Sequence, residues 1–442
     1  MAYSETVSTT SPTAAPVFDS THDEDIVLVG HPFAPIGMGE LLRASCRAFR
    51  SVAARIRVYD VYGQGPAIDG DLRKEFDPLL TDRLSPFLNI FCINGNEISD
   101  VFNHLRAPLP PTSYNIIRPM WELPRYPREW AGDVGRFQEV WTASRFTEAS
   151  LRDAVSIPVS RMPVGIEPRF SRTLGRRYFG IPEAPFTFLF AFDFLSFIER
   201  KNPFAVLEAF RRLTRLRPRH DVRLVFKLNN SRERPLDHRL FLARVAEASD
   251  GIVLIDRGMT DAEIKNLIRC CDCFVSLHRS EGYGVALAEA MYFRKAVVAT
   301  GYSANLDFMS KENSLLVPYE LVAVPAGSYP HADGQVWAEP DIDFAVDAMA
   351  RLLDDRAYHR RLGEVASRYI RSRFSYRSVG LQYLSRIAEI TSATRTSASH
   401  AASIRHPTAE MGLGPGPGAP ASTNTSIPMT PTRSPERPCP PV

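Results

Sequence analysis

Two glutamates separated by seven residues are the clearest candidates for chemistry in this chain. The stretch 278–291 reads HRSEGYGVALAEAM, with Glu281 in a loop after a strand-like run and Glu289 in an alanine-rich helical segment. Glu289 lies about one turn along that helix, on a face that can look back toward the loop. Carboxylates accept hydrogen bonds from paired hydroxyls, such as those of a ribose or a hexose. The spacing therefore indicates one hydroxyl-rich ligand held by both acids.

The turn between the two acids favours an anion. Gly282 and Gly284, with Tyr283 between them, let the backbone turn sharply and approach a ligand closely. The helix begins near Val285, where free N–H groups and the helix dipole attract negative charge. An anion site flanked by two carboxylates indicates a sugar nucleotide, with phosphates at the helix start and hydroxyls on the acids.

Two adjacent cations follow an earlier strand of the same half of the chain. Arg200 and Lys201, in IERKNPF, stand between a predicted strand at 186–194 and a predicted helix at 203–213. The fork of an arginine and the point charge of a lysine both suit a diphosphate. Because positive charge at a helix start opposes the helix dipole, this position favours a ligand role over a solvated surface role.

The elements that must position these residues alternate between strands and helices. In the first half we predict helices at 37–49 and 144–154, and strands at 25–29, 55–59, 87–93, 114–117 and 139–143. After a linker at 163–168 the pattern restarts, with helices at 203–213, 261–270 and 285–293, and strands at 186–194, 222–228, 251–256, 273–277 and 296–300. Runs this apolar fit strands buried on both faces of a parallel sheet. We predict two Rossmann-like, doubly wound α/β domains whose facing carboxyl edges form a ligand cleft.

These motifs resemble the retaining glycosyltransferases of family 4, which have the GT-B fold. The resemblance rests on the glutamate pair in SEGYGVALAEAM, on RKNP after FAFDF, and on TGYSANLDFM at 300–309, and it covers roughly residues 25–390. We expect an N-terminal acceptor domain and a C-terminal nucleotide-sugar domain, over 25–165 and 166–375. By analogy with GT-B relatives, a closing helix at 376–390 packs back on the first domain. The Ser-, Thr- and Pro-rich segments 1–24 and 392–442 are predicted to be disordered tails.

The resemblance also implies roles for individual residues. Glu281 would bind the hydroxyls of the donor sugar and help to stabilise the transition state, and Glu289 would hold the ribose hydroxyls. Arg200 and Lys201 would neutralise the leaving diphosphate. The catalytic candidates are therefore Glu281, Arg200 and Lys201.

Further donor contacts are expected from loops at the same edge. The turn of Gly37, Met38 and Gly39 after the first strand would let the backbone of the first domain reach the phosphates. The base of the donor would lie near Arg257 and Met259. Gly282, Tyr283, Gly284 and Val285 complete the predicted donor site.

The segment 118–130, RPMWELPRYPREW, is the predicted acceptor side. Aromatic faces stack on sugar rings, which makes Trp121 a candidate, and Glu122 could accept a hydrogen bond from the acceptor hydroxyl. Asn94, at the end of a strand, is a third polar candidate. A core role for the rings, a surface role for Glu122 and a turn role for Asn94 stay open as alternatives.

Composition bounds the remaining possibilities. The 442 residues are 44% hydrophobic and 23% charged, which is ordinary for a soluble globular protein. The net charge of +3 is too small to indicate nucleic-acid binding by itself. No run approaches the roughly 18 apolar residues of a membrane span. Six cysteines without a disulfide framework favour a reducing compartment, so the cytoplasm is expected, with a peripheral contact at the inner face of the membrane left open.

Neither a metal nor a cofactor is expected. The spacing of Cys270, Cys271 and Cys273 does not match zinc pairs, and no D-x-D dyad stands in a suitable loop. Transfer from a sugar nucleotide passes through an oxocarbenium-like state and is accelerated when charge on the leaving phosphate is stabilised. The prediction is a retaining, metal-independent hexosyltransferase acting on a glycan or lipid-linked acceptor in polysaccharide or lipopolysaccharide biosynthesis. An epimerase of GT-B fold and a non-catalytic sugar-nucleotide-binding protein are the alternatives.

Overall fold

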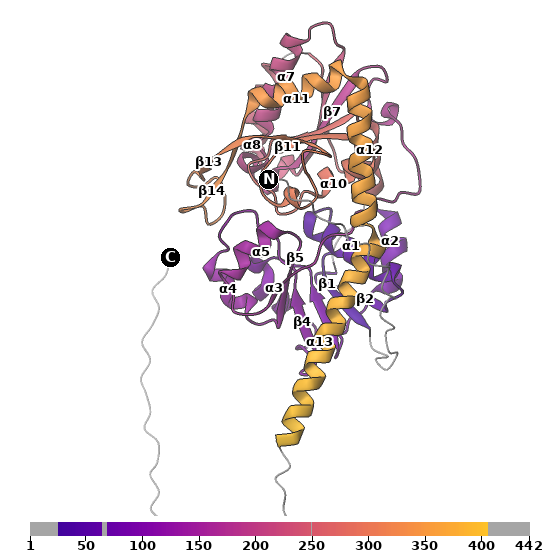
Figure 1. Ribbon diagram of the computed structural model, residues 1–442, viewed down its shortest axis with the longest axis vertical. Helices are drawn as coiled ribbons and strands as arrows, with labels where there is room; N and C mark the ends of the chain where they lie inside the picture. The colour runs from indigo at the N-terminus through magenta and orange to yellow at the C-terminus, as the bar shows by residue number, and fades with distance from the viewer. Residues whose placement is uncertain (1–24, 64–68, 249, 405–442) are drawn as a thin grey trace, which may run out of the picture. The chain divides into compact units, whose positions relative to one another are not determined.

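Two six-stranded parallel sheets organise the chain, one in each half (Figure 1). The computed structural model describes residues 25–63, 69–248 and 250–404. Every strand pairing inside the two sheets is parallel. This confirms the predicted α/β fold of two Rossmann-like sheets.

The first sheet has the strand order β2-β1-β3-β4-β5-β6. Strand β1, between β2 and β3, is buried along its whole length, and Leu28 pairs with Val58 on one side and Ile90 on the other. The strands are β1 Ile26–Gly30, β2 Ile56–Asp60, β3 Leu88–Phe91, β4 Tyr114–Ile117, β5 Glu139–Thr142 and β6 Val159–Arg161. The helices between them are α1 Gly37–Ser51, α2 Gly70–Phe76, α3 Ile98–His104, α4 Arg128–Val134 and α5 Arg145–Arg152.

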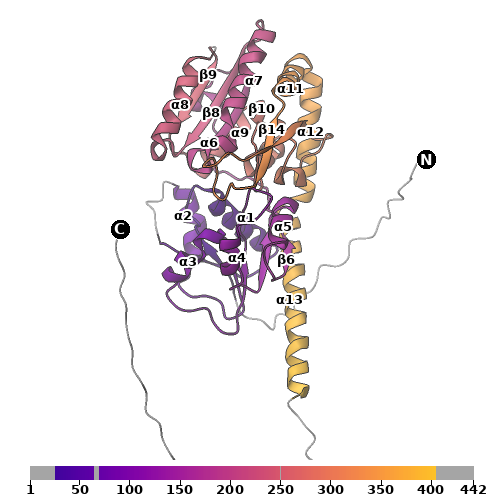
Figure 2. The same cartoon turned by 90° about the vertical axis from the view of Figure 1, so that its left-hand side faces the viewer.

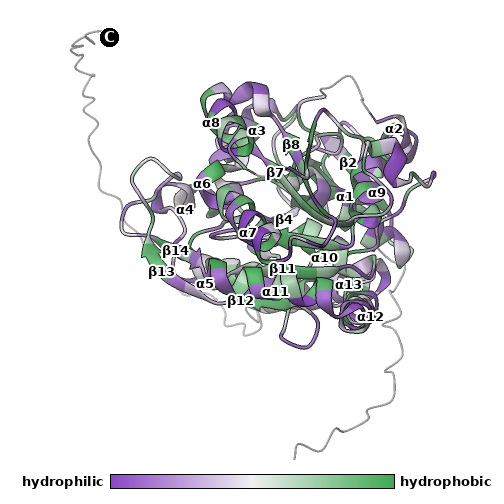
Figure 3. Cartoon of the chain, turned by 90° about the horizontal axis from the view of Figure 1, so that it is seen from above, coloured by the Kyte–Doolittle hydropathy of each residue, from purple (hydrophilic) through white to green (hydrophobic). Residues whose placement is uncertain are grey.

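The second sheet has the order β12-β11-β10-β7-β8-β9. Its strands are β7 Phe186–Asp193, β8 Val222–Asn229, β9 Ile252–Asp256, β10 Cys273–Ser276, β11 Ala296–Thr300 and β12 Leu315–Val317. The helices that accompany them are α6 Ile198–Lys201, α7 Pro203–Leu216, α8 Pro235–Ala246, α9 Asp261–Cys270, α10 Val285–Tyr292, α11 Ile342–Asp354 and α12 Arg356–Arg373 (Figure 2). Figure 3 shows polar and apolar residues alternating along α7, which buries one face.

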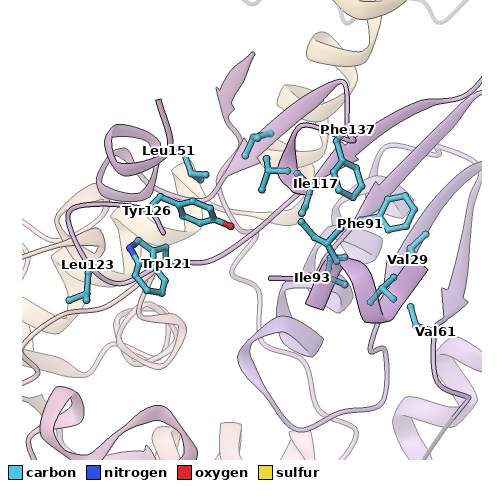
Figure 4. Packing of buried hydrophobic residues seen from close by; sticks show 14 of the residues in the cluster. Val29, Val61, Phe91, Ile93, Ile117, Trp121, Leu123, Tyr126, Phe137 and Leu151 are labelled. Carbon is cyan, nitrogen blue, oxygen red and sulfur yellow. The ribbon is translucent and has the colours of Figure 1, made fainter. Parts of the chain in front are cut away.

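An antiparallel hairpin that the sequence patterns did not predict extends from the second half toward the first. It consists of β13 Tyr319–Ala323 and β14 Val336–Pro340. Val324, Tyr329, Ala332 and Trp337, from this hairpin and its loop, are buried in one apolar cluster with residues of the first half. Figure 4 shows residues of that cluster from the first half, among them Trp121, Leu123 and Tyr126. The hairpin thus ties the two halves together on one side of the molecule.

The two halves are also joined by the linker after β6 and by the helix that closes the chain, α13 (Tyr376–Ile404). Ile166 N–H in the linker donates to the carbonyl oxygen of Phe374 at 2.6 Å. Near the start of α13, Tyr383 donates to the carbonyl oxygen of Pro163 at 2.6 Å, and Arg386 Nε lies 2.9 Å from Glu139 Oε1 of β5. The first turns of α13 therefore contact the linker and the first sheet.

The start of the predicted C-terminal tail is wrong, because α13 continues to Ile404 and a disordered tail was expected from 392. The segment 391–404 contains alanines and neither proline nor glycine, so nothing in it stops a helix before Pro407. The tail segments 1–24 and 405–442 lie outside the described residues. Within the ranges that the structure describes, no helix has the length and apolarity needed to cross a membrane.

Candidate active site

Both sheets reverse their strand order at one point, and several of the predicted site residues lie in the segments that follow the strands at those points. In the second sheet the reversal falls between β7 and β10, whose following segments carry Lys201 and Glu281. In the first sheet it falls between β1 and β3, whose following segments carry Gly37 and Asn94. Because ligands of open α/β sheets bind at such switch points, this topology explains why residues distant in the sequence share one edge.

Glu281, whose side chain is 13% exposed, lies beside two cations. Its Oε1 accepts a hydrogen bond from Lys201 Nζ and lies 3.7 Å from Arg200 Nη1. Its backbone N–H donates to Ser303 Oγ at 2.8 Å, which fixes the loop. Burial alone would raise the pKa of Glu281, but the charges of Lys201 and Arg200 outweigh burial and lower it to about 2. Glu281 is therefore an ionised acceptor at neutral pH.

The two cations differ in exposure. The side chain of Arg200 is 4% exposed, whereas that of Lys201 is 17% exposed. Arg200 donates to the carbonyl oxygens of Ser280 at 2.9 Å and Ser196 at 3.2 Å, so much of its guanidinium group is already hydrogen-bonded to the backbone. Lys201 is thus the better placed of the two cations to contact a ligand. Arg200 adds positive charge from a buried position beside Glu281.

Glu122 of the first half reaches this cluster. Its Oε1 lies 3.8 Å from Arg200 Nη2, and its backbone carbonyl accepts a hydrogen bond from the Ser280 hydroxyl. A methyl group added at Gly282 would lie 3.4 Å from Glu122 Oε1. The loop of Glu281 therefore passes within van der Waals range of the Glu122 side chain at Gly282.

A cavity of about 890 Å³ opens beside this cluster, between the two halves. Five residues that were predicted to lie at the donor line it: Gly37, Arg257, Met259, Val285 and Glu289. The first half contributes 33–37, Glu40, Arg43, Asp69 and Leu72, and the second half contributes 227–233, 256–261, Ile264, 285–286 and Glu289. Glu281, Arg200 and Lys201 are not among its lining residues. The loop 282–284 connects Glu281 to the cavity wall at Val285.

Glu289 shares one buried lysine with two other carboxylates. Lys265 Nζ lies 4.0 Å from Glu289 Oε1, 2.6 Å from Asp261 Oδ2 and 3.6 Å from Glu40 Oε1. Burial raises the pKa of Glu289, and the neighbouring Glu40 and Asp261 raise it further, while Lys265 opposes the rise. Burial also raises the pKa of Glu40, but Lys265 and two arginines of α1 lower it to about 2. Glu289 therefore holds a proton more readily than Glu40 does.

The first turn of α1 forms part of the cavity wall. No side chain caps the helix at Ile36, and Gly37 has open space around it. Uncapped N–H groups at the start of a fifteen-residue helix favour an anion. A glycine is needed at position 39 for a different reason, because an added methyl group would lie 2.3 Å from the carbonyl oxygen of Ala34. Packing of its own loop, rather than approach to a ligand, requires that glycine.

Three predicted contacts have interior partners in the structure. Trp121 is 3% exposed, and its indole N–H donates to the carbonyl oxygen of Arg125 at 2.8 Å, so it belongs to the apolar core and presents no face for a sugar. Asn94 Oδ1 accepts from the backbone N–H of Met120, in a distant loop, at 3.0 Å. Tyr283 donates to the carbonyl oxygen of Val164 in the linker at 3.2 Å and does not line the cavity.

These contacts favour the core role that was left open for Trp121, and contacts of Asn94 and Tyr283 with a ligand stay predictions. A ring or an amide at the carboxyl edge of a sheet can serve either the ligand or the loop that carries it, and local sequence does not distinguish the two.

Arg257 stands at the rim of the cavity. Its side chain is 45% exposed, and Nη1 lies 2.8 Å from Glu263 Oε1. The neighbouring residues 258–261 line the cavity and lead into α9, whose start is capped by Thr260 and Glu263. These capping bonds fix the end of the loop after β9.

Several residues of the site had no role in the sequence analysis. His278 is fully buried, with Nδ1 3.0 Å from Ser276 Oγ and Nε2 3.2 Å from Asn305 Oδ1. Burial lowers the pKa of His278 to about 4, so the imidazole is neutral. Ser303, which holds Glu281, has φ of +70°, an unfavourable conformation for a serine. His278 lies in the motif 278–291 and Ser303 in the motif 300–309. Membership of these motifs was the sequence feature that could have indicated a role for both residues.

The fold and this cleft define the GT-B class of architecture: two Rossmann-like domains with a site at their facing edges. The family model described as Glycosyl transferases group 1 matches residues 178–369, which is less than half of the chain. The match and the architecture together support the glycosyltransferase group 1 family. No match was found among curated proteins.

Solved structures with the same architecture cover most of the chain. HepE of Anabaena in complex with UDP-glucose is 14% identical, with a TM-score of 0.60, and the match covers 84% of this chain and 100% of that one. Sucrose-phosphate synthase from Thermosynechococcus elongatus gives the same four values. At such low identity, these likenesses establish the fold.

Proposed function

We propose that this protein is a retaining glycosyltransferase that moves a hexose from a nucleotide-diphosphate sugar to a glycan or lipid-linked acceptor without a metal ion. The observation that carries the proposal is the contact of Lys201 with Glu281 at the switch point, next to a cavity lined by Gly37 and Glu289. The group 1 family match over 178–369 supports it, as does the likeness to HepE with bound UDP-glucose.

The charges of the site suit departure of a diphosphate. When the bond between the anomeric carbon and the diphosphate oxygen breaks, negative charge develops on the phosphate. Lys201 would meet that charge directly, with the buried charge of Arg200 behind it. The uncapped start of α1 and the start of α10 would add backbone N–H groups. Glu281, ionised at neutral pH, would accept hydrogen bonds from the sugar hydroxyls and stabilise positive charge on the ring.

Retention would follow if the acceptor attacked from the face on which the diphosphate leaves. The departing phosphate oxygen could then take the proton of the acceptor hydroxyl, and no separate base would be needed. Glu122, beside Arg200 and Gly282, is the carboxylate of the first half that we assign to the acceptor hydroxyl. We assign the acceptor to the domain over 25–165 and the donor to the domain over 166–375. Polysaccharide or lipopolysaccharide biosynthesis is the pathway class that such an acceptor implies.

A donor panel tests this function. The full chain is incubated with UDP-, GDP-, ADP- and dTDP-hexoses in chelator, and release of nucleoside diphosphate is followed together with thermal stabilisation. Slow transfer to water is expected with one base, and NMR of the released sugar should show the donor's own anomeric configuration first. Release of the inverted anomer would refute retention. Interconversion of sugars with no net release would indicate an epimerase, and stabilisation without turnover would indicate a binding protein.

A further inference from the structure

One buried lysine of the cavity has no role in the site described so far. Lys227, near the end of β8, is 1% exposed and lines the cavity. Its Nζ donates to the carbonyl oxygen of Leu228 and to Asn229 Oδ1, which are both neutral acceptors. Among the described residues, no carboxylate forms an ion pair with it. Buried charges are normally paired, so this cation lacks the partner that its burial calls for.

The nearest carboxylates are held by other donors. Asp256 on β9 accepts from Ser231 Oγ at 2.8 Å, and Asp193 at the end of β7 accepts from Asn230 Nδ2 at 2.7 Å. These acids influence the charge of Lys227 at longer range without contacting it. The ammonium group therefore stays available for an anion that enters from the cavity.

The other cations that line the cavity differ from Lys227. Arg43 lies 2.9 Å from Glu40 Oε2, and Arg257 lies 2.8 Å from Glu263 Oε1. Arg232 is exposed to solvent. Within the part of the chain that the structure describes, Lys227 is thus the cavity-lining cation that is both buried and without an ion pair.

The position of β8 in the sheet places Lys227 on the path of the donor. β8 lies between β7, which leads to Lys201, and β9, which leads to Arg257, and Lys227 pairs with Ala191 and Ile255 on these neighbours. A ligand whose sugar lies at the β7/β10 switch point and whose base lies near the loop after β9 has to pass the end of β8. Its phosphates are the negatively charged part of such a ligand.

We propose that Lys227 is a donor-binding residue that neutralises the phosphates of the nucleoside diphosphate from the floor of the cavity. This inference rests on the proposed function. A full charge without a counter-ion favours a phosphate over a carbonyl of the base, since a carbonyl needs a hydrogen-bond donor and no net charge.

The titration of Lys227 gives a second observable. Burial lowers the pKa of Lys227 to about 8, and the charged groups that face it are Asp256, Arg257, Asp193 and Glu263. The protonated form binds phosphate, so the contribution of Lys227 to affinity is present below pH 8 and declines above it. Diphosphate affinity should therefore fall between pH 7 and 9 in the wild type, and less so in Lys227→Met.

The test compares diphosphates with their nucleosides by calorimetry. UDP, GDP, ADP and dTDP, the corresponding nucleosides, and pyrophosphate are titrated into the wild-type chain, Lys227→Met, Lys227→Arg and the control Lys311→Met, whose lysine is exposed and does not line the cavity. We expect Lys227→Met to lose about 10- to 100-fold in affinity for the diphosphate and for pyrophosphate, the size of a charge-assisted hydrogen bond. Nucleoside affinity should change less than about threefold, Lys227→Arg should recover part of the loss, and Lys311→Met should bind the diphosphate like the wild type.

The outcomes separate this inference from the proposed function. An equal loss for nucleoside and diphosphate would mean that Lys227 contacts the base, and it would overturn the inference. No loss for the diphosphate would also overturn it. If the wild type binds pyrophosphate through Lys227 but binds no nucleotide, the anion site stands and the proposed function fails. Unchanged thermal unfolding of Lys227→Met excludes loss of the fold as the cause.

Discussion

The hydroxyl of Tyr329 donates a hydrogen bond to Glu122 Oε2 at 2.6 Å. Tyr329 stands in the loop of the β13–β14 hairpin, and Glu122 belongs to the first half of the chain. The Tyr329 ring centre also lies 5.6 Å from Arg200 Cζ, and Arg200 is adjacent to Lys201 in sequence. The hairpin thus supplies one wall of the polar cluster, and Tyr329 acts as a positioning residue for Glu122 and Arg200.

Tyr329→Phe keeps the ring and removes the hydrogen bond. We expect kcat/KM to fall about tenfold, the size of one lost bond to a charged group, with the loss concentrated in the KM for the acceptor. Donor affinity, measured by calorimetry, should stay unchanged. Tyr319→Phe in the same hairpin is the matched control, because that ring is 37% exposed. Equal kinetics for wild type and Tyr329→Phe would remove Tyr329 from the site.

Glu281→Ala and Lys201→Ala should each lower turnover at least about 100-fold while the fold survives, because charge stabilisation at a leaving group is of this size. Release of nucleoside diphosphate measures the effect, and circular dichroism checks the fold. Glu199→Ala is the control, since Glu199 is exposed and only two residues from Lys201. Near-normal turnover in both site variants would contradict the roles proposed for them.

Glu289→Ala should chiefly weaken donor binding. The expected loss is about 10-fold in nucleotide affinity, since a pair of hydroxyl hydrogen bonds is removed, and turnover at saturating donor should change less. For a deoxyribose form of the nucleotide, the affinities of wild type and Glu289→Ala should differ less. If the variant binds the nucleotide as well as the wild type does, the ribose does not contact Glu289.

His278 should make stability depend on pH. Its folded pKa of about 4 lies below the unfolded value near 6.5, so the unfolded state binds the extra proton between these values. The contribution is therefore present above pH 6.5 and is lost as the pH falls toward 4, by up to about 3 kcal/mol.

The measurement is the free energy of unfolding by urea at pH 7 and pH 5, compared between wild type and His278→Gln. Taking the difference between the chains cancels the opposing contribution of other acids, such as Glu289. His104→Gln is the control, because His104 is exposed. A difference between wild type and His278→Gln that does not change with pH would show that His278 is not held neutral by burial.

The sequence by itself determined the elements and the residues that follow directly from them. Apolar runs such as 222–228 are buried strands because no other element buries both faces of a short segment. The helix predicted at 261–270 has the bounds of α9, since its capping residues stand next to it in the chain. Once the strands are known, the loops after β7 and β10 must meet at one edge, and for that reason Lys201 and Glu281 could be paired in advance.

The tertiary structure alone decided which neighbours in sequence face the site. Trp121 and Glu122 are adjacent, yet the ring is buried in the core and the carboxylate reaches Arg200. Tyr329 was singled out by its contacts with Glu122 and Arg200, which are far away in the chain. Lys227 was singled out because it is buried and forms no ion pair among the described residues. Burial and pairing depend on long-range packing, and no local pattern of residue types carries that information.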